Sequence, residues 1–308
     1  MRLNGIHHVT AITGDAPGNV DFYARVLGLR LVKKTVNQDD PSVYHLFYAD
    51  DGGSAGSDIT FFEYPGARPG RAGAGMVHRV VYRLGSDDAL DFWAGRLEAE
   101  GIDVQRNGGQ LRFADPEGLG LQLRVVRTDD EPLVADHPEI PRELALQGFD
   151  AVCAYADDPE QSRPLLEDTL GFGAAGASSW KIRGETRGSV YMYDEAPPDQ
   201  GVPGAGTVHH VAWSSRMDEH DAWRSRVAEA GVQVTPVIDR FYFRSIYLRE
   251  PSGVLFEIAT MGPGFATDEP LEHLGERLSL PPNFEHLRDQ VERSLTPLPD
   301  PRAPRVTQ

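Results

Sequence analysis

Two histidine pairs, each followed by valine, begin strand-like runs in distant parts of the chain. The first is His7 and His8 in GIHHVT, and the second is His209 and His210 in TVHHVAW. A carboxylate, Glu257, lies in a further apolar run, VLFEIAT. Two imidazoles and one carboxylate that leave coordination positions open are typical of non-haem Fe(II) oxygenases. These residue types therefore predict a metal site of that kind.

The elements that would position these residues form an internal repeat. A strand (IHHVTAIT), a short helix ending near Gly28 and three further strands give the first copy the order βαβββ. Equivalent orders begin at MVHRVVYRL, GFDAVCAYA and TVHHVAWSS. The turns DPEGLGLQL and EPSGVLFEI share an acid, a proline and a glycine before an apolar strand, which indicates matching hairpins. The sequence thus predicts an α+β fold of four βαβββ modules.

The predicted module boundaries follow from these repeats. They are 1–66 for module one, 74–128 for module two, 129–146 for a linker, 147–196 for module three, 205–261 for module four and 262–308 for a C-terminal tail. The candidate ligands lie in modules one and four, so these two modules must share one open barrel around the metal. Modules two and three are then expected to form a second, metal-free barrel.

Superposition of the modules compares the candidate ligands with their counterparts. His8 and His210 align with Arg79 and Ala151, and Glu257 aligns with Gln122. A lone histidine in a strand is usually a hydrogen-bonded core residue. A packing role would not require two imidazoles and a carboxylate at equivalent inward positions, so the metal interpretation is favoured.

The other histidines have less support as ligands. Strict alternation along a strand places His7 and His209 on the face opposite to the candidate ligands. Three more histidines have no repeat partner of a suitable type and are assigned structural or surface positions: His45, His78 and His220.

The composition restricts the class of protein. The net charge of −17 disfavours nucleic acid and anionic membranes as partners. The chain contains no apolar run long enough for a membrane span, and its N-terminus lacks a secretory signal pattern, so we expect a cytoplasmic protein. The single cysteine, Cys153, excludes an internal disulfide framework.

Several stretches resemble the vicinal oxygen chelate superfamily, which includes glyoxalases, bleomycin-resistance proteins and extradiol dioxygenases. They are HHVT, FYARVLGL, HHVAW and EPSGVLFEIAT. Within that superfamily, YHLFYAD and DRFYFRSIYLREPSGVLFEIAT are similar to ring-cleaving dioxygenases of the hydroquinone type. The similarity covers nearly the whole chain and extends into the tail at DEPLEHLGERLSLPP.

The resemblance implies a specific activity and a set of site residues. His8, His210 and Glu257 would bind Fe(II) or Mn(II), with O2 as co-substrate, and a small aromatic compound, either a hydroquinone or a catechol, would be cleaved next to its metal-bound phenolate. Positions that contact the ligands or the substrate would be occupied by Thr10, Arg240, Tyr247, His7 and His209. The last two could reach the ligands only if their strands are twisted or bulged. A homodimer is compatible with the superfamily.

Three alternatives stay open at this point. Glu63 ends the fourth strand of module one, and as a fourth ligand it would favour a glyoxalase-like isomerase or lyase. A resistance protein that sequesters a drug or an aromatic ligand would need no complete metal triad. A zinc hydrolase is compatible with a ligand set of two histidines and a glutamate, but the motif contains no evident general base.

Overall fold

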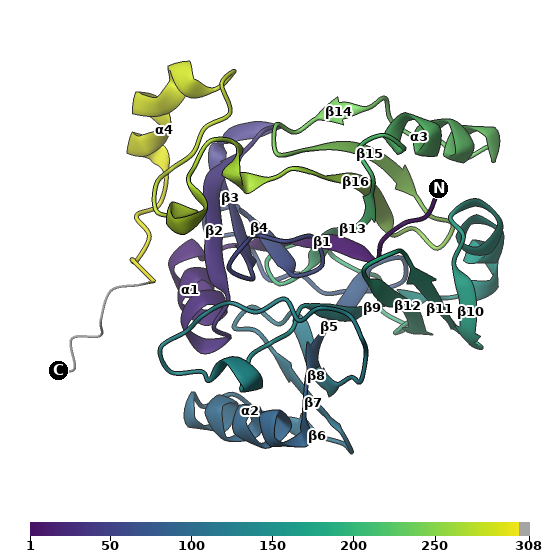
Figure 1. Cartoon of the computed structure of the whole chain (residues 1–308), viewed down its shortest axis with the longest axis horizontal. Coiled ribbons are helices and arrows are strands. Elements are labelled where there is room, and N and C mark those ends of the chain that lie inside the picture. The colour runs from purple at the N-terminus through teal and green to yellow at the C-terminus, as the bar shows by residue number, and fades with distance from the viewer. Residues whose placement is uncertain (302–308) are drawn as a thin grey trace.

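The fold consists of two eight-stranded sheets, seen side by side in Figure 1. The computed structural model describes residues 1–301. The first sheet has the order β14-β15-β16-β13-β1-β4-β3-β2, and the second has the order β10-β11-β12-β9-β5-β8-β7-β6. Each order places the strands of two repeat units next to each other, with the first strands of the two units paired at the centre.

The first sheet joins the first and fourth units. Its strands are β1 (Ile6–Thr13), β2 (Arg30–Asn37), β3 (Asp40–Ala49), β4 (Asp58–Glu63), β13 (Val208–Ser215), β14 (Ile238–Asp239), β15 (Phe243–Arg249) and β16 (Leu255–Pro263). The expectation that units one and four form one barrel is confirmed, because β1 pairs antiparallel with β13.

The second sheet joins the second and third units, as expected. Its strands are β5 (Val77–Leu84), β6 (Gln105–Arg106), β7 (Gln110–Ala114), β8 (Gly120–Val125), β9 (Phe149–Ala156), β10 (Gly173–Gly176), β11 (Ser179–Arg183) and β12 (Gly188–Glu195). The α+β class with four βαβββ modules is therefore confirmed, whereas the exact module boundaries stay a prediction.

Few helices accompany the sheets (Figure 1). The α-helices are α1 (Ala16–Val20), α2 (Asp87–Ala99), α3 (His220–Glu229) and α4 (Arg288–Ser294). Two π-helical segments are η1 (Asp21–Val26) and η4 (Leu165–Thr169), and the 3₁₀ turns are η2 (Arg142–Leu144), η3 (Pro159–Ser162), η5 (Phe265–Thr267), η6 (Leu271–His273) and η7 (Glu285–Leu287). The third unit carries η3 and η4 at the place where the first unit carries α1 and η1 and the other two units carry α2 and α3.

Helix α2 shows how local sequence directs packing onto a sheet. The Ser86 side chain caps its first turn by accepting a hydrogen bond from the backbone N–H of Ala89 at 3.1 Å. Leu90, Trp93 and Leu97 recur on one face at helical spacing and are buried. The capped, one-sided helix therefore covers the second sheet.

The C-terminal segment packs on the edge of the first sheet, where α4 lies beyond β2 and β3 in Figure 1. The ammonium group of Lys33 on β2 is fully buried beneath it. It donates to Asp268 at 2.7 Å, to Glu269 and to the Phe265 carbonyl. A buried charge requires such compensation, so these contacts hold the segment against β2.

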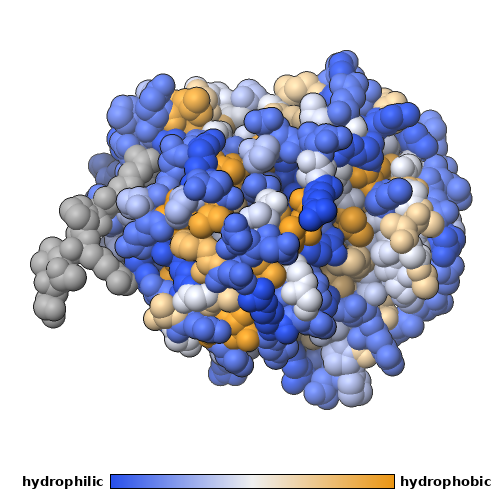
Figure 2. Space-filling model, turned by 60° about the horizontal axis from the view of Figure 1, so that its bottom comes forward, coloured by the Kyte–Doolittle hydropathy of each residue, from blue (hydrophilic) through white to orange (hydrophobic). Residues whose placement is uncertain are grey.

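The surface is polar over the face seen in Figure 2, with hydrophobic residues only scattered across it. Within residues 1–301, none of the helices has the length and apolar character needed to cross a bilayer.

Candidate metal centre

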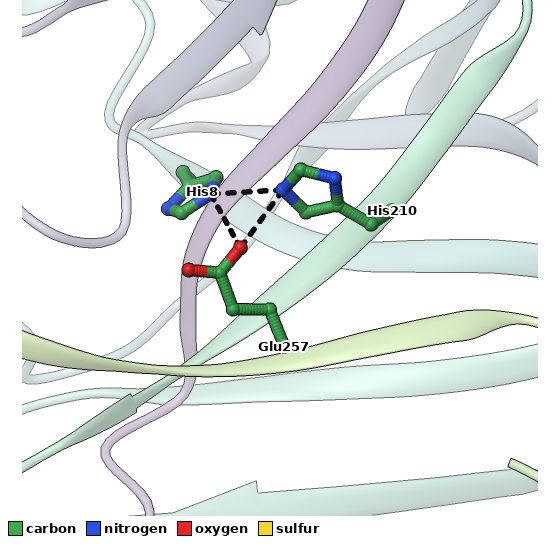
Figure 3. A group of neighbouring side chains, drawn as sticks. All are labelled: His8, His210 and Glu257. Carbon is green, nitrogen blue, oxygen red and sulfur yellow. Dashed lines mark hydrogen bonds and ion pairs between the residues drawn. The ribbon is translucent and has the colours of Figure 1, made fainter. Parts of the chain in front are cut away.

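Three buried side chains converge in the first sheet, as Figure 3 shows. His8 Nε2 lies 3.2 Å from His210 Nε2. Glu257 Oε2 lies 3.3 Å from His8 Nε2 and 2.9 Å from His210 Nε2. The structure therefore brings together all three predicted ligands.

The strand pairing explains this convergence. In the antiparallel pair of β1 and β13, His210 lies opposite Thr10, two residues from His8. In the parallel pair of β13 and β16, Glu257 lies beside Ala212, two residues after His210. Three adjacent strands at the middle of the sheet thus each contribute one donor atom.

Neighbouring groups orient the candidate ligands. His7 Nε2 lies 3.1 Å from the Thr260 carbonyl, which can only accept, so this nitrogen carries the proton. A neutral His7 then accepts at Nδ1 from His8 Nδ1–H, 2.9 Å away. This leaves a lone pair on His8 Nε2, facing the cluster, as a metal ligand requires.

The second histidine pair makes contact through the same ring atoms. The Nδ1 atoms of His209 and His210 are 2.8 Å apart. On the carboxylate, Ser245 Oγ donates to Glu257 Oε1 at 2.5 Å, while Oε2 has no neighbouring donor apart from the two imidazoles. A buried carboxylate oxygen and two imidazole nitrogens directed at one point fit a divalent cation.

The protonation states also suit a cation. Burial, followed by the neighbouring His8, lowers the pKa of His7 to about 3, and burial lowers the pKa of His209 to about 4 and that of His210 below its ordinary value. Burial alone would raise the pKa of Glu257, but His8 and His210 hold it well below its usual range. Neutral imidazoles and an ionised carboxylate are the forms that bind metal.

The expectation from strict alternation is wrong for His7 and His209. Both rings contact the adjacent ligand rather than pointing away from it. The pairing of β1 with β13 shifts register between Ile6 and Val9 and again between Thr10 and Ala11. Such irregularities rotate successive side chains away from strict alternation, which allows two neighbouring histidines to reach one site.

Glu63 does not reach the cluster, so the proposal of a fourth ligand is wrong. In the parallel pairing of β1 with β4, Glu63 lies beside Thr13, five positions beyond His8. The position that corresponds to Glu257 is Thr60, which lies beside Thr10. A hydroxyl thus replaces a second carboxylate, which removes the ligand set on which the isomerase alternative depended.

A hydrogen-bond chain occupies this side of the centre. Thr10 Oγ1 lies 2.8 Å from Thr60 Oγ1, which lies 2.9 Å from His45 Nε2. His45 also stands between Phe47 and Phe62, with ring centroids 3.9 and 4.4 Å away. Thr10, which is expected near the ligands, is therefore connected through Thr60 to His45, a residue that the sequence alone predicts to be structural or on the surface.

A cavity beside the cluster is walled largely by rings. They belong to His45, Phe47, Phe62, Tyr242, Phe243 and Tyr247. Tyr247 packs against His210 with ring centroids 5.9 Å apart, and Arg240 donates to its hydroxyl across 3.4 Å. Both expected residues, Tyr247 and Arg240, line this cavity, which suits a flat aromatic molecule.

Sequence reasoning missed His45 because it has no histidine at the corresponding place in the other units. The signal that could have found it is its position in YHLFYAD, one of the stretches that resemble the dioxygenases. The other two histidines predicted to be structural or on the surface bond to neighbouring side chains: His220 Nδ1 lies 3.0 Å from Ser215 Oγ, and His78 Nε2 lies 3.1 Å from Asp194.

Comparison with known proteins agrees with this geometry. The family model described as Glyoxalase/Bleomycin resistance protein/Dioxygenase superfamily matches residues 5–123 and 148–258. The chain is 42% identical to "Putative ring-cleaving dioxygenase MhqO" of Bacillus subtilis over 96% of this chain and 97% of that protein. It is 32% identical to chlorohydroquinone/hydroquinone 1,2-dioxygenase of Sphingobium indicum over 96% of each chain.

A solved structure shows the same architecture. The crystal structure of a "putative dioxygenase" from Bacillus subtilis is 40% identical and superposes with a TM-score of 0.90, covering 97% of this chain and 98% of that chain. Both repeat pairs are thus shared over essentially the full length. The chain therefore belongs to the Glyoxalase/Bleomycin resistance protein/Dioxygenase superfamily.

Proposed function

We propose that the protein is a metal-dependent, extradiol-type ring-cleaving dioxygenase that inserts O2 into a hydroquinone- or catechol-type ring next to a metal-bound phenolate. The observation that carries this proposal is the set of three converging donors, His8, His210 and Glu257, with Thr60 at the place of a fourth. Three ligands leave positions for both a phenolate and O2. The named activities of the relatives support the same reaction class.

The metal, Fe(II) or Mn(II), would lower the pKa of a coordinated ring hydroxyl and provide the site for O2 activation. The remaining chemistry belongs to the chain. Phe47, Phe62 and Phe243 exclude water from the ring and hold its plane. Tyr247 donates a hydrogen bond into the cavity, and the Arg240 guanidinium stabilises negative charge that develops there.

His45 has a ring nitrogen suited to moving a proton. Its Nε2 is engaged by Thr60, and no hydrogen bond joins Nδ1 to any residue of the described chain. Burial is the main cause that lowers the pKa of His45 well below its ordinary value, so the ring is neutral. We assign Nδ1 as the acceptor for a hydroxyl proton of the bound ring. Because the lowered pKa makes this nitrogen a weak base, the transfer would depend on metal coordination lowering the pKa of that hydroxyl.

The test is metal analysis of protein purified without oxygen, followed by O2 uptake with hydroquinone, methylhydroquinone and catechol. We expect iron or manganese near one equivalent per chain and O2 consumption only with an aromatic substrate. Both should be lost in His210→Ala. Zinc or nickel without O2 uptake would contradict the proposal, and tight aromatic binding by metal-free protein would instead favour a sequestering protein.

A further inference from the structure

Two hairpin tips from different repeat units meet at the cavity. Gln38 and Asp39 form the turn between β2 and β3 of the first unit, and Arg240 follows β14 in the fourth. Gln38 Nε2 donates to the Arg240 carbonyl at 2.8 Å. All three residues line the cavity, so this contact forms part of its wall.

The Arg240 guanidinium lies between the metal centre and solvent. Its two Nη atoms donate to the two carboxylate oxygens of Asp39 at 3.1 and 3.0 Å. On the inner side, its Cζ lies 5.5 Å from the centre of the Tyr247 ring, which in turn packs on His210. The Arg240 side chain is 18% exposed and that of Asp39 is 72% exposed. Asp39 therefore binds Arg240 from the outside.

The charges around the cavity indicate that the pair of Arg240 and Asp39 controls whether an anionic substrate can bind. Among the described side chains that line it, Arg240 is the one arginine or lysine, and the acids are Asp39 and Glu257. A carboxylate on a substrate ring would need a cation as its partner, and a guanidinium binds a carboxylate best through two parallel N–H groups. Asp39 already takes the edge formed by the two Nη atoms, and Nε on the other edge donates to Tyr247. A ring carboxylate that binds through two parallel N–H groups would therefore have to displace one of these partners, and it would also face the negative charge of Asp39.

From this geometry we infer that Asp39 is a specificity-determining residue: by holding Arg240 in a bidentate ion pair, it restricts the substrate to dihydroxylated rings without an anionic substituent. The inference rests on the proposed function, because it concerns the same cavity. It adds the chemical class of substrate that the cavity rejects and the residue responsible.

The experiment compares two probes of similar size in the metal-loaded, full-length protein. Methylhydroquinone carries an uncharged substituent, whereas 2,5-dihydroxybenzoate carries a carboxylate on the same hydroquinone ring. Their dissociation constants are measured without oxygen and their KM values with oxygen, for wild type, Asp39→Asn and Asp40→Asn. Asp40 is the matched control because its carboxylate accepts hydrogen bonds from Ser42 rather than from Arg240.

Asp39→Asn should lower the ratio of the dissociation constants, carboxylated over methylated probe, by about tenfold or more, which is the effect of one charge-assisted hydrogen bond. Asp40→Asn removes the same charge one residue away and should leave the ratio within about twofold, since the Asp40 carboxylate bonds to Ser42 and makes no contact with Arg240. Adding Arg240→Met to Asp39→Asn should abolish the gain. This last variant shows that the gain acts through the guanidinium.

Two failures are distinguishable. If wild type converts methylhydroquinone but Asp39→Asn leaves the ratio unchanged, or if both Asn variants shift it equally, the inference about Asp39 is overturned while the proposed function stands. If metal-loaded wild type neither binds methylhydroquinone nor consumes O2 with it, the proposed function fails and the inference fails with it.

Discussion

His45 and Ser245 occupy equivalent positions in the two halves of the first sheet. On β3, His45 lies two residues before Phe47, the partner of Thr60, and on β15 Ser245 lies two residues before Tyr247, the partner of Glu257. Each side chain contacts the polar group beside it: His45 Nε2 lies 2.9 Å from Thr60 Oγ1, and Ser245 Oγ lies 2.5 Å from Glu257 Oε1. One half thus presents a carboxylate supported by serine, and the other presents a hydroxyl supported by histidine.

Replacing Thr60 with glutamate should add a second carboxylate, and thus a fourth ligand, to the centre. Thr60→Glu is expected to reduce O2 uptake with methylhydroquinone by at least about tenfold, because the added ligand occupies a position needed by substrate or O2. Zinc affinity should rise in the same variant. Thr60→Ser, which keeps the hydroxyl, is the control, and equal activity of the Glu and Ser variants would refute the assignment of Thr60.

Removing His45 should impair proton transfer without removing the metal. His45→Phe and His45→Gln are expected to lower kcat/KM for methylhydroquinone by about 10²-fold. Metal content, measured by elemental analysis, should match wild type. The exposed His286→Gln serves as control. Loss of metal together with activity would instead assign His45 to the integrity of the site.

Ser245 should affect the metal rather than the substrate. Ser245→Ala removes the hydrogen bond to Glu257 Oε1, so we expect metal affinity to fall by about 10- to 100-fold. Ser214→Ala is a matched control, since Ser214 is equally buried and its hydroxyl has no hydrogen-bond partner among the described residues. Competition with a chelator measures both variants, and similar losses in the two would contradict the role of Ser245.

Lys33 should stabilise the fold through the C-terminal segment. Lys33→Met leaves the Glu269 and Asp268 carboxylates without their cation, and removing one partner of a buried ion pair costs about 3–5 kcal/mol. Lys34→Met is the control, because Lys34 Nζ donates a hydrogen bond to the Glu276 carbonyl in an exposed position. Urea unfolding gives both free energies of unfolding, and a cost below that of the control would show that Asp268 and Glu269 do not depend on Lys33.

His78, in the second sheet, should make the free energy of unfolding depend on pH. Burial is the main cause that lowers its pKa from 6.5 to about 4. Between these values the unfolded chain binds a proton that the folded chain does not, so this contribution is present above pH 6.5 and is lost as pH falls through about 4. The loss amounts to at most about 3 kcal/mol.

His78→Gln should therefore show a shallower decline in free energy of unfolding over that pH range than wild type. His273→Gln, at an exposed histidine, should decline like wild type. Parallel curves for wild type and His78→Gln would remove His78 as the source.

The strands and the modular order of this protein can be predicted from the sequence, because both depend on residue patterns over short stretches of the chain. Alternating β-branched runs and matching turns predict the modules, and comparison of modules separates His8, His210 and Glu257 from their counterparts Arg79 and Gln122. The shared barrel of units one and four follows from the requirement that three ligands meet at one ion.

Only the tertiary structure decided which neighbours these residues have. Register between parallel strands depends on packing across the whole sheet, so Glu63 and Thr60 could not be distinguished along β4 alone. Shifts in the pairing of β1 with β13 turn His7 toward the ligands against the local alternation. The sequence by itself determined the types of the candidate ligands and the order of the modules. The tertiary structure decided that Thr60 rather than a carboxylate stands at the fourth position, that His45 faces the cavity and that Asp39 pairs with Arg240. These features depend on contacts between segments far apart in the chain.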